Sequence, residues 1–214
     1  MTVFAVLAGG GTAGHVLPAL AVADALVARG HPRESLHFVG AARGMEATMV
    51  PDAGYDITLL AVQGVQRSLS PAAARAAGRF GAALPGSMAL LRRLRPQVVI
   101  SVGGYASVPP VLAAWALRIP VVVVSYDAVP GAAARLQSRL AAANAVAFAT
   151  SPLPRREVTG APLRSTILGI DRARDQAAAR AALGLPTDRF TLLVVGGSLG
   201  SGKLNDVVAA LAPA

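Results

Sequence analysis

The apolar positions of this chain alternate between short continuous runs and longer stretches with helical spacing. Val3–Ala8 is a continuous run of strand length, and from Val16 onward apolar residues recur at the spacing of one helix face. Runs of the same kind follow at Leu36–Val39, Ile57–Val62, Val98–Val102, Val121–Val124, Ala145–Phe148 and Leu192–Val195. Strands that are apolar along their whole length and alternate with helices predict an α/β fold, in which helices cover both faces of a Rossmann-like parallel sheet.

The stretches between these runs predict the helices. After the first helix, which Gly30 closes, they are Gly44–Met49, Pro109–Leu117, a helix from Gly131 to Ala143, Asp175–Leu183 and Lys203–Ala212. Pro18 is expected in the first turn of the first helix, where a missing N–H costs nothing. Pro71–Leu94 has a helical pattern that several glycines and Pro85 interrupt, so we expect a broken helix there.

Four glycines stand between the first strand and the first helix, Gly9, Gly10, Gly11 and Gly14, and His15 follows them. A strand, a glycine turn and a helix bring backbone N–H groups together at a helix N-terminus, where they attract phosphate. A plain turn needs only one or two glycines, so this loop indicates a diphosphate site. At its mouth, a neutral imidazole can accept a proton from a hydroxyl group.

The same glycines also match the dinucleotide fingerprint, Gly9-x-Gly11-x-x-Gly14. That fingerprint expects an acidic residue at the end of the second strand to bind a ribose hydroxyl, and the first carboxylate after this strand is Glu46. The NAD alternative therefore lacks its confirming residue, and Arg43 leaves a narrow case for NADP.

Two further units of strand, glycine loop and helix occur in the chain. Gly103-Gly104-Tyr105 follows Val98–Val102, and Gly196-Gly197-Ser198-Leu199-Gly200 follows Leu192–Val195. In a parallel sheet such loops gather at the carboxyl ends of the strands, where ligands bind. The third loop also resembles a nucleotide-hydrolysing P-loop, but Leu204 stands where that motif needs the hydroxyl that holds magnesium.

Composition narrows the possible functions. The chain has no cysteine, which excludes disulfides, cysteine metal ligands and a cysteine nucleophile. The net charge of +9 comes from basic residues that are scattered and not interleaved with aromatic ones, so we expect no nucleic-acid partner. No basic segment precedes the first strand, which argues against a signal peptide, and the glycines and prolines of Pro96–Leu117 argue against a membrane span. We expect a cytoplasmic protein that can touch a membrane surface.

The stretch Pro71–Leu94 allows two interpretations. Apolar residues such as Phe80 and Leu91 alternate with arginines such as Arg92 and Arg93, a combination that can lie among lipid headgroups. A helix packed on the sheet with a solvated basic face explains the same pattern and is the interpretation we favour. Exposure of the apolar residues beside the cleft would instead favour a lipid acceptor.

Ser151–Leu163 is richer in Pro, Arg and Gly than the sequence before it, which is typical of a linker. We therefore expect one Rossmann-like domain at residues 1–163 and the start of a second at residues 164–214. The second segment holds a single βα unit, which is too little to bury a core of its own. We expect the chain to be part of a two-domain protein and to be inactive alone.

Three glycine loops in two Rossmann-like halves resemble the pattern of the GT-B glycosyltransferases. Four stretches are similar, in order and spacing, to the peptidoglycan enzymes of glycosyltransferase family 28: Gly10–Ala21, Gly103–Trp115, Gly160–Arg164 and Gly196–Gly200. The resemblance implies a GT-B fold and an inverting transfer of N-acetylglucosamine from UDP-N-acetylglucosamine to the 4-hydroxyl of undecaprenyl-diphospho-muramoyl-pentapeptide, at the cytoplasmic face of the cell membrane. It implies no metal and no cofactor beyond the UDP-sugar donor.

The resemblance also implies roles for the two domains and for individual residues. The first domain would bind the polyprenyl-diphosphate-linked acceptor and the second the donor. His15 is implied as the catalytic base, and we hypothesise that Asp127 shares this role. The implied substrate-binding residues are Thr12, Ala13, Gly14, Gly104, Tyr105, Asp127, Arg164 and Ser198, the last two of them on the donor.

The chain departs from the family pattern at a few positions. Val124-Ser125-Tyr126-Asp127 stands where the family typically has His-Glu-x-Asn, Ala13 replaces a glycine, and Leu199 replaces a glutamine. These differences leave two alternatives open, which are a related GT-B enzyme with another acceptor and a non-catalytic binding module.

Overall fold

The computed structural model describes residues 3–62, 71–196 and 200–211. The chain divides into two compact units, Met1–Arg164 and Ser165–Ala214. The first unit holds every strand of the described sheet, and the second holds helices and their connecting segments.

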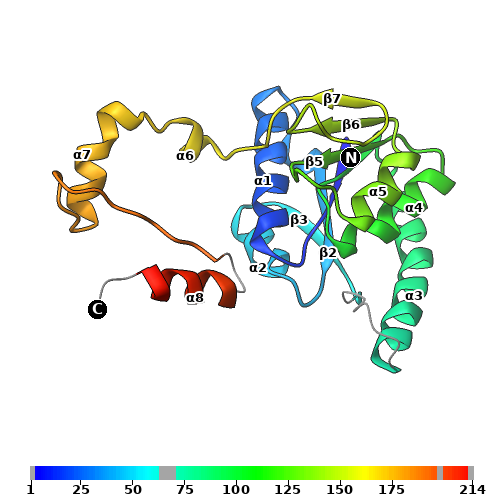
Figure 1. Ribbon diagram of the computed structural model, residues 1–214. Helices are drawn as coiled ribbons and strands as arrows, with labels where there is room; N and C mark the ends of the chain where they lie inside the picture. Colours follow the sequence, from blue (N-terminus) through cyan, green and yellow to red (C-terminus); the bar gives the residue numbers. More distant parts are fainter. Residues whose placement is uncertain (1–2, 63–70, 197–199, 212–214) are drawn as a thin grey trace. The chain divides into compact units, whose positions relative to one another are not determined.

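Seven parallel strands form the sheet of the first unit (Figure 1). In sequence order they are β1 (Ala5–Ala8), β2 (Leu36–Ala41), β3 (Asp56–Leu60), β4 (Val98–Ser101), β5 (Val121–Ser125), β6 (Ala143–Val146) and β7 (Arg156–Val158). Their order in the sheet is β3-β2-β1-β4-β5-β6-β7. The chain winds outward from β1 to β3, returns to β4 on the other side of β1 and winds outward again. The strand order therefore reverses between β1 and β4, and the predicted α/β fold is confirmed.

Helices cover both faces of this sheet, as predicted (Figure 1). Along β1, Ala5 and Leu7 belong to the core beneath the first two helices of the unit, whereas Val6 and Ala8 belong to the core beneath the third and fourth. This alternation follows from the geometry of a strand, whose successive side chains point to opposite faces. The helices of this unit are α1 (Ala13–Ala28), α2 (Glu46–Asp52), α3 (Pro71–Leu94), α4 (Val108–Ala116) and α5 (Ala132–Leu140), with 3-10 turns at Arg33–Ser35 and Tyr105–Ser107.

α3 is one helix, so the predicted break is wrong. Leu91 is buried in the core that α3 shares with α4, and packing of this kind outweighs the weak helix propensity of Gly and Pro. Arg92 and Arg93 are exposed. Over residues 81–94 the favoured interpretation, a packed helix with a solvated basic face, is confirmed. Phe80 is among the residues whose side chains lie outside the described part.

The edge strand β7 lies inside the predicted linker. It pairs with β6, and all of its residues are exposed, so no apolar pattern marked it as a strand. The buried Asn144 fixes the approach to it, because the Asn144 side-chain amide donates to the carbonyl of Pro154 at 2.6 Å. The other strands of this unit lie within a few residues of their predicted positions.

The second unit contains α6 (Ser165–Leu168), α7 (Arg172–Ala182) and α8 (Gly202–Leu211). The predicted strand Leu192–Val195 is wrong, because among the described residues of this unit no neighbouring strand offers backbone groups to pair with. Leu193 in this segment is 82% exposed. An apolar run of strand length becomes a strand only beside a partner.

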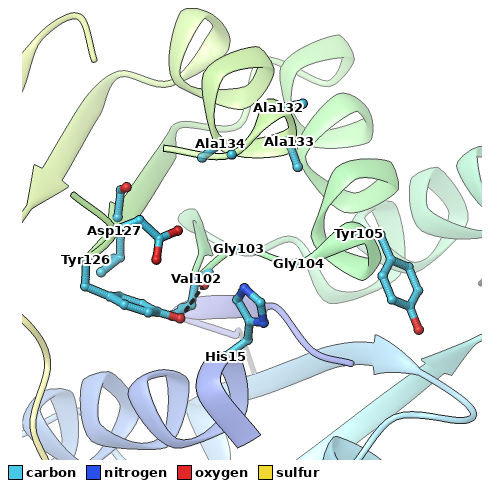
Figure 2. Close-up of a pocket in the computed structure, with 13 residues that line it drawn as sticks. His15, Val102, Gly103, Gly104, Tyr105, Tyr126, Asp127, Ala132, Ala133 and Ala134 are labelled. Carbon is cyan, nitrogen blue, oxygen red and sulfur yellow. Dashed lines mark hydrogen bonds between the residues drawn. The ribbon is translucent and has the colours of Figure 1, made fainter. Parts of the chain in front are cut away.

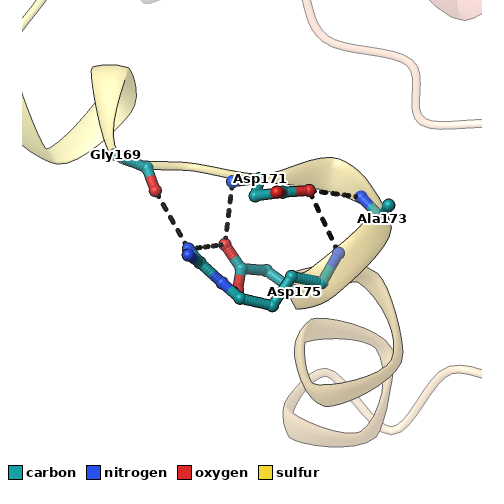
Figure 3. A network of polar contacts seen from close by, with 5 residues as sticks. Gly169, Asp171, Ala173 and Asp175 are labelled. Atoms are coloured by element: carbon teal, nitrogen blue, oxygen red, sulfur yellow. Dashed lines mark hydrogen bonds and ion pairs between the residues drawn. The ribbon is translucent and has the colours of Figure 1, made fainter.

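A network of polar contacts fixes the start of α7 (Figure 3). Asp171 caps the helix, since its carboxylate accepts hydrogen bonds from the backbone N–H of Ala173 at 2.9 Å and of Arg174 at 3.1 Å. Asp175 accepts from the backbone N–H of Asp171 and pairs with the Arg174 guanidinium at 2.7 Å. The helix therefore begins at Arg172, before the predicted start at Asp175.

Within the described residues, no helix is at once long enough and apolar enough to cross a bilayer. The uncharged stretch Pro96–Leu117 folds as β4, a glycine loop and α4, as predicted. Proline occupies the first turn of α4, where its missing N–H is tolerated.

Gln137 of α5 is completely buried and holds the loop that follows β4. Its side-chain oxygen accepts a hydrogen bond from the Ser101 hydroxyl, and its amide donates to the Ser107 hydroxyl at 2.9 Å. Ser107 in turn donates to the carbonyl of Gly104 at 2.8 Å. A buried chain of satisfied hydrogen bonds therefore connects α5 to the second glycine loop.

Replacing the Gln137 amide should destabilise the first unit. Gln137→Leu removes both hydrogen bonds and leaves the buried Ser101 hydroxyl without an acceptor, so the free energy of unfolding should fall by about 3 kcal/mol. Urea unfolding measures this loss. Gln97→Leu, at an exposed position, is the matched control and should change stability by less than about 0.5 kcal/mol. Equal stability of the two variants would contradict the role of the network.

Candidate functional site

A cavity of about 250 Å³ opens at the carboxyl ends of β1, β4 and β5 (Figure 2). The start of α1, the loops after β4 and β5, and the first turn of α5 form its walls. The lining residues are His15, Val102–Tyr105, Val124–Asp127 and Gly131–Ala134. This position is the point where the strand order reverses, which is the expected ligand site of an open parallel sheet.

The first two glycine loops meet through their backbones beside this cavity. A Cβ atom on Gly104 would lie 2.4 Å from the carbonyl oxygen of Gly10, and the φ angle of Gly104 is +80°, so a side chain does not fit there. A Cβ atom on Gly103 would lie 3.0 Å from the ring of His15. The two loops therefore converge, as their places at the strand ends predict.

His15 lies in the first turn of α1, and its ring lines the cavity. Nδ1 lies 3.3 Å from the hydroxyl oxygen of Thr12, and the ring edge formed by Cδ2 and Nε2 faces Gly103. Burial lowers the pKa of His15 below its ordinary value of 6.5, against the opposing negative charges of Asp127 and Glu46. The imidazole is therefore neutral at neutral pH and can accept a proton.

The prediction that Pro18 lies in the first turn of α1 is wrong, because the helix already begins at Ala13. A proline inside a helix has no N–H group and cannot donate a hydrogen bond to the carbonyl four residues earlier, which for Pro18 is that of Gly14. The hydroxyl of Tyr126, from the loop after β5, donates to this carbonyl at 2.6 Å. Tyr126 thus supplies the hydrogen bond that Pro18 cannot make, and it ties two walls of the cavity together.

Tyr126 keeps its proton at physiological pH. Burial, together with the neighbouring charge of Asp127, raises the pKa of Tyr126 to about 12. Its hydroxyl also contacts the carbonyl of Val102 at 3.3 Å, which is the dashed line in Figure 2. The Asp127 carboxylate and the His15 ring point toward the same space (Figure 2).

Four of the predicted site residues come together at this cavity, and they are His15, Gly104, Tyr105 and Asp127. The Tyr105 ring turns away from His15 (Figure 2) and lies beside Gly11, since a Cβ on that glycine would be 3.1 Å from the ring. The structure therefore places Tyr105 at the rim rather than against the histidine.

The described residues among the other predicted site residues do not line the cavity. Thr12 is the N-cap of α1, and Ala13 and Gly14 are the first residues of that helix. Arg164 is exposed at the end of the first unit, and Ser198 lies outside the described residues. Their assigned roles stay predictions.

Two features of the cavity were missed by sequence reasoning. The Ser125 hydroxyl is buried, lines the cavity and has no hydrogen-bond partner among the described residues. Ala132–Ala134 also line it, at the start of a helix that the structure shows without a side-chain cap at Gly131. Uncapped N–H groups at a helix N-terminus attract an anion. The Pro130-Gly131 pair signalled the helix start, but alanine side chains carry no chemical signal.

The first glycine loop bears on the dinucleotide alternative. The Glu46 side chain is buried, and its carboxylate accepts a hydrogen bond from the backbone N–H of Gly11 at 2.8 Å. A bound dinucleotide would need that N–H for its pyrophosphate, so the geometry argues against the NAD and NADP alternatives. Over the described ranges, no group of three or more His, Cys, Asp or Glu side chains is arranged to hold a metal.

Comparison with known proteins identifies the relatives of this chain. Residues 5–146 match the glycosyltransferase family 28 N-terminal domain. Proteins named UDP-N-acetylglucosamine–N-acetylmuramyl-(pentapeptide) pyrophosphoryl-undecaprenol N-acetylglucosamine transferase are 44% identical in Nocardioides sp. strain JS614 and 45% identical in Clavibacter michiganensis subsp. michiganensis. These alignments cover 97% and 99% of this chain, but only 57% and 58% of the relatives. The chain thus spans little more than half the length of the curated relatives it matches.

Solved structures share the fold. MurG of Acinetobacter baumannii matches with a TM-score of 0.68 and 28% identity, covering 96% of this chain and 55% of that protein. UDP-GlcNAc 2-epimerase of Neisseria meningitidis has a TM-score of 0.54 at 15% identity, covering 86% of this chain and 54% of that one, and shows likeness of fold alone. The GT-B type of fold predicted from the sequence is confirmed by the MurG match.

The lowered pKa of His15 makes stability depend on pH. Because the unfolded chain binds this proton more tightly than the folded chain, stability should be complete above pH 6.5 and fall as the pH drops below it. His37, whose pKa burial also lowers, acts with the same sign. Urea unfolding at about pH 7.5 and about pH 5.5 measures the loss, which should be smaller in His15→Gln. An NMR titration that places His15 above 6.5 would refute this expectation.

Removing the Tyr126 hydroxyl tests its link to Pro18. Tyr126→Phe leaves the Gly14 carbonyl without its donor and should lower the free energy of unfolding by about 1 kcal/mol. In a Pro18→Ala background the same change should cost less, because the N–H of the new alanine can bond to that carbonyl. A double-mutant cycle by urea unfolding measures the difference. The same cost in both backgrounds would show that the tyrosine does not compensate for the proline.

Proposed function

Because this chain belongs to glycosyltransferase family 28, we propose that it is the acceptor-side part of an inverting transferase. The proposed reaction moves N-acetylglucosamine from UDP-N-acetylglucosamine to the 4-hydroxyl of undecaprenyl-diphospho-N-acetylmuramoyl-pentapeptide, a step of peptidoglycan synthesis. The family match over residues 5–146 and the names of the relatives support this choice of substrates.

One observation of the structure carries the proposal. A neutral imidazole, that of His15, shares a cavity with the Asp127 carboxylate at the point where the strand order reverses. A base at this place, with water partly excluded, suits the removal of a proton from a sugar hydroxyl. Asp127 adds a negative charge that favours the imidazolium once the proton has moved.

The chemistry is a single displacement. The acceptor oxygen forms a bond to the anomeric carbon of the donor sugar while the bond from that carbon to the UDP oxygen breaks. The electron pair of the broken bond leaves with UDP, and the hydroxyl proton moves to His15, with Asp127 sharing the role of base. Attack on the face opposite UDP inverts the anomeric configuration.

The acceptor's diphosphate has a suitable place at the first turn of α5. The N–H groups of Ala132–Ala134, at a helix start without a side-chain cap, can donate to phosphate oxygens. The Ser125 hydroxyl, which has no partner among the described residues, can do the same. Both features lie in the same cavity as His15, so an acceptor bound through its diphosphate can present its sugar to the base.

The donor is proposed to bind with the help of Arg164 and Ser198, with no metal or other cofactor. A guanidinium can pair with a diphosphate through two parallel hydrogen bonds, and helix N-termini can stabilise the leaving UDP. The exposure of Arg164 leaves its guanidinium available for this contact.

Because the proposed acceptor is lipid-linked, the transfer is proposed to take place at the cytoplasmic face of the membrane. In the described part of α3, Leu90 and Leu91 are buried and the other leucines and Met88 pack against the same core. None of these residues lines the cavity. The exposed Arg92 and Arg93 of α3 can meet anionic lipid headgroups instead. The proposal of a lipid acceptor therefore rests on the family and not on α3.

A turnover assay tests the proposal. Residues 1–214 are produced alone and as a completed chain, continued by the remaining sequence of the Nocardioides relative, and assayed with labelled UDP-N-acetylglucosamine and the lipid-linked acceptor. The completed chain should transfer the sugar and the isolated chain should not. His15→Ala should lower kcat/KM by roughly 100- to 10,000-fold, the usual contribution of a general base, and Asp127→Asn should alter the acidic limb of the pH–rate profile.

His31→Gln is the matched control, because His31 stacks on Phe4 and does not line the cavity. It should leave turnover unchanged. Transfer to a soluble acceptor but not to the lipid-linked one would favour the related enzyme with another acceptor. No transfer from any UDP-sugar by a folded completed chain would refute the proposed function, and an acidic limb unaffected by Asp127→Asn would refute the shared base.

A further inference from the structure

Glu46 is a carboxylate buried inside the first unit. Only 1% of its surface is exposed, and it stands at the start of α2, just beyond β2. Its Oε2 accepts from the backbone N–H of Gly11 at 2.8 Å, and its Oε1 accepts from the backbone N–H of Ala41 at 2.6 Å. Hydrogen bonds to an ionised acceptor are among the stronger ones in proteins, and these two join the first glycine loop to the end of β2.

Three glycines leave the space that this side chain fills. A Cβ atom added to Gly10 would lie 2.0 Å from the nearest side-chain atom of Glu46. The same distance would be 2.3 Å for Gly40 and 2.1 Å for Gly44. A side chain at any of these positions would force the carboxylate off its two N–H donors. Three positions, one in β2 and two in the loops after β1 and β2, are therefore free of side chains around one buried carboxylate.

The charge of the Glu46 carboxylate also acts on two residues that line the cavity, His15 and Tyr105. On His15 this charge opposes the effect of burial on the pKa, and it raises the pKa of Tyr105 in addition to burial. Gly11, which Glu46 holds, is followed by Thr12 at the N-cap of α1, and His15 is in the first turn of that helix.

We propose that Glu46 is a positioning residue, the resident anion of the first glycine loop, which holds Gly11 and the start of α1 so that His15 faces the cavity. The loop thus binds a carboxylate of its own chain where a phosphate-binding loop would bind its ligand. The consequence for turnover rests on the proposed function, whereas the structural role does not.

NMR on the chain itself tests the structural role. In Glu46→Gln only one oxygen remains for two N–H donors, so the amide proton of Gly11 or Ala41 should shift upfield, and the His15 pKa should fall further with the charge removed. Glu34→Gln, at an exposed position, is the matched control and should change neither. An unchanged Gly11 amide and an unchanged His15 pKa in Glu46→Gln would overturn the proposal.

A further pair of variants covers the case in which Glu46→Gln does not fold. Gly40→Ala should displace the Glu46 side chain without removing its charge, and should cost less stability when combined with Glu46→Ala. Equal costs of Gly40→Ala with and without Glu46 would count against the proposal.

Kinetics of the completed chain test the consequence for turnover. Glu46→Gln should lower kcat by roughly 10- to 100-fold through misplacement of the base, while the KM for UDP-N-acetylglucosamine stays within about two-fold. Full kcat in a variant whose Gly11 amide has shifted would overturn the positioning role. A completed chain that retains Glu46 and transfers no sugar would instead refute the proposed function, and the NMR result would still decide the role of Glu46.

Discussion

Backbone contact between the first two glycine loops is the constraint on which the site depends. Gly104 approaches the carbonyl oxygen of Gly10 only because it has no side chain, and this approach brings the loop after β4 against the loop after β1. The first turn of α1 then lies beside the loop after β4, so His15 faces Gly103. Partial burial of the imidazole follows from this arrangement, and with it a base that is neutral at neutral pH.

Buried polar groups hold both loops from behind. Glu46 binds the N–H of Gly11 on one side, and Gln137 reaches the carbonyl of Gly104 through Ser107 on the other. These groups have their hydrogen-bond partners within the protein, which is what makes burial of a polar group tolerable. Loops fixed in this way need no substrate to order them, so less binding energy is lost to ordering when a ligand arrives.

Most of the fold could be predicted because each apolar run and glycine loop is a local pattern. The unpredicted features depend on contacts between distant parts of the chain. Leu192–Val195 has the composition of a strand but no partner strand among the described residues of its unit. Pro18 lies inside α1, where Tyr126 supplies the hydrogen bond that the proline cannot make. The same holds for the site. His15 could be predicted because it follows the glycines directly. The role of Glu46 could not, because its two backbone donors, on Gly11 and Ala41, belong to other segments of the chain. The α5 wall is made of backbone N–H groups, which no side-chain motif reports.

The departure from the family pattern after β5 is structurally coherent. The Tyr126 hydroxyl donates a hydrogen bond to the Gly14 carbonyl. The Asp127 carboxylate lines the cavity at a position where the family typically has a neutral amide. Burial alone weakens His15 as a base, and the charge of Asp127 opposes that weakening. A general base acts best when its pKa is near the working pH, so the exchange of amide for carboxylate moves His15 in the useful direction. If His15 is the base, as proposed, the altered segment is a different way of tuning its pKa.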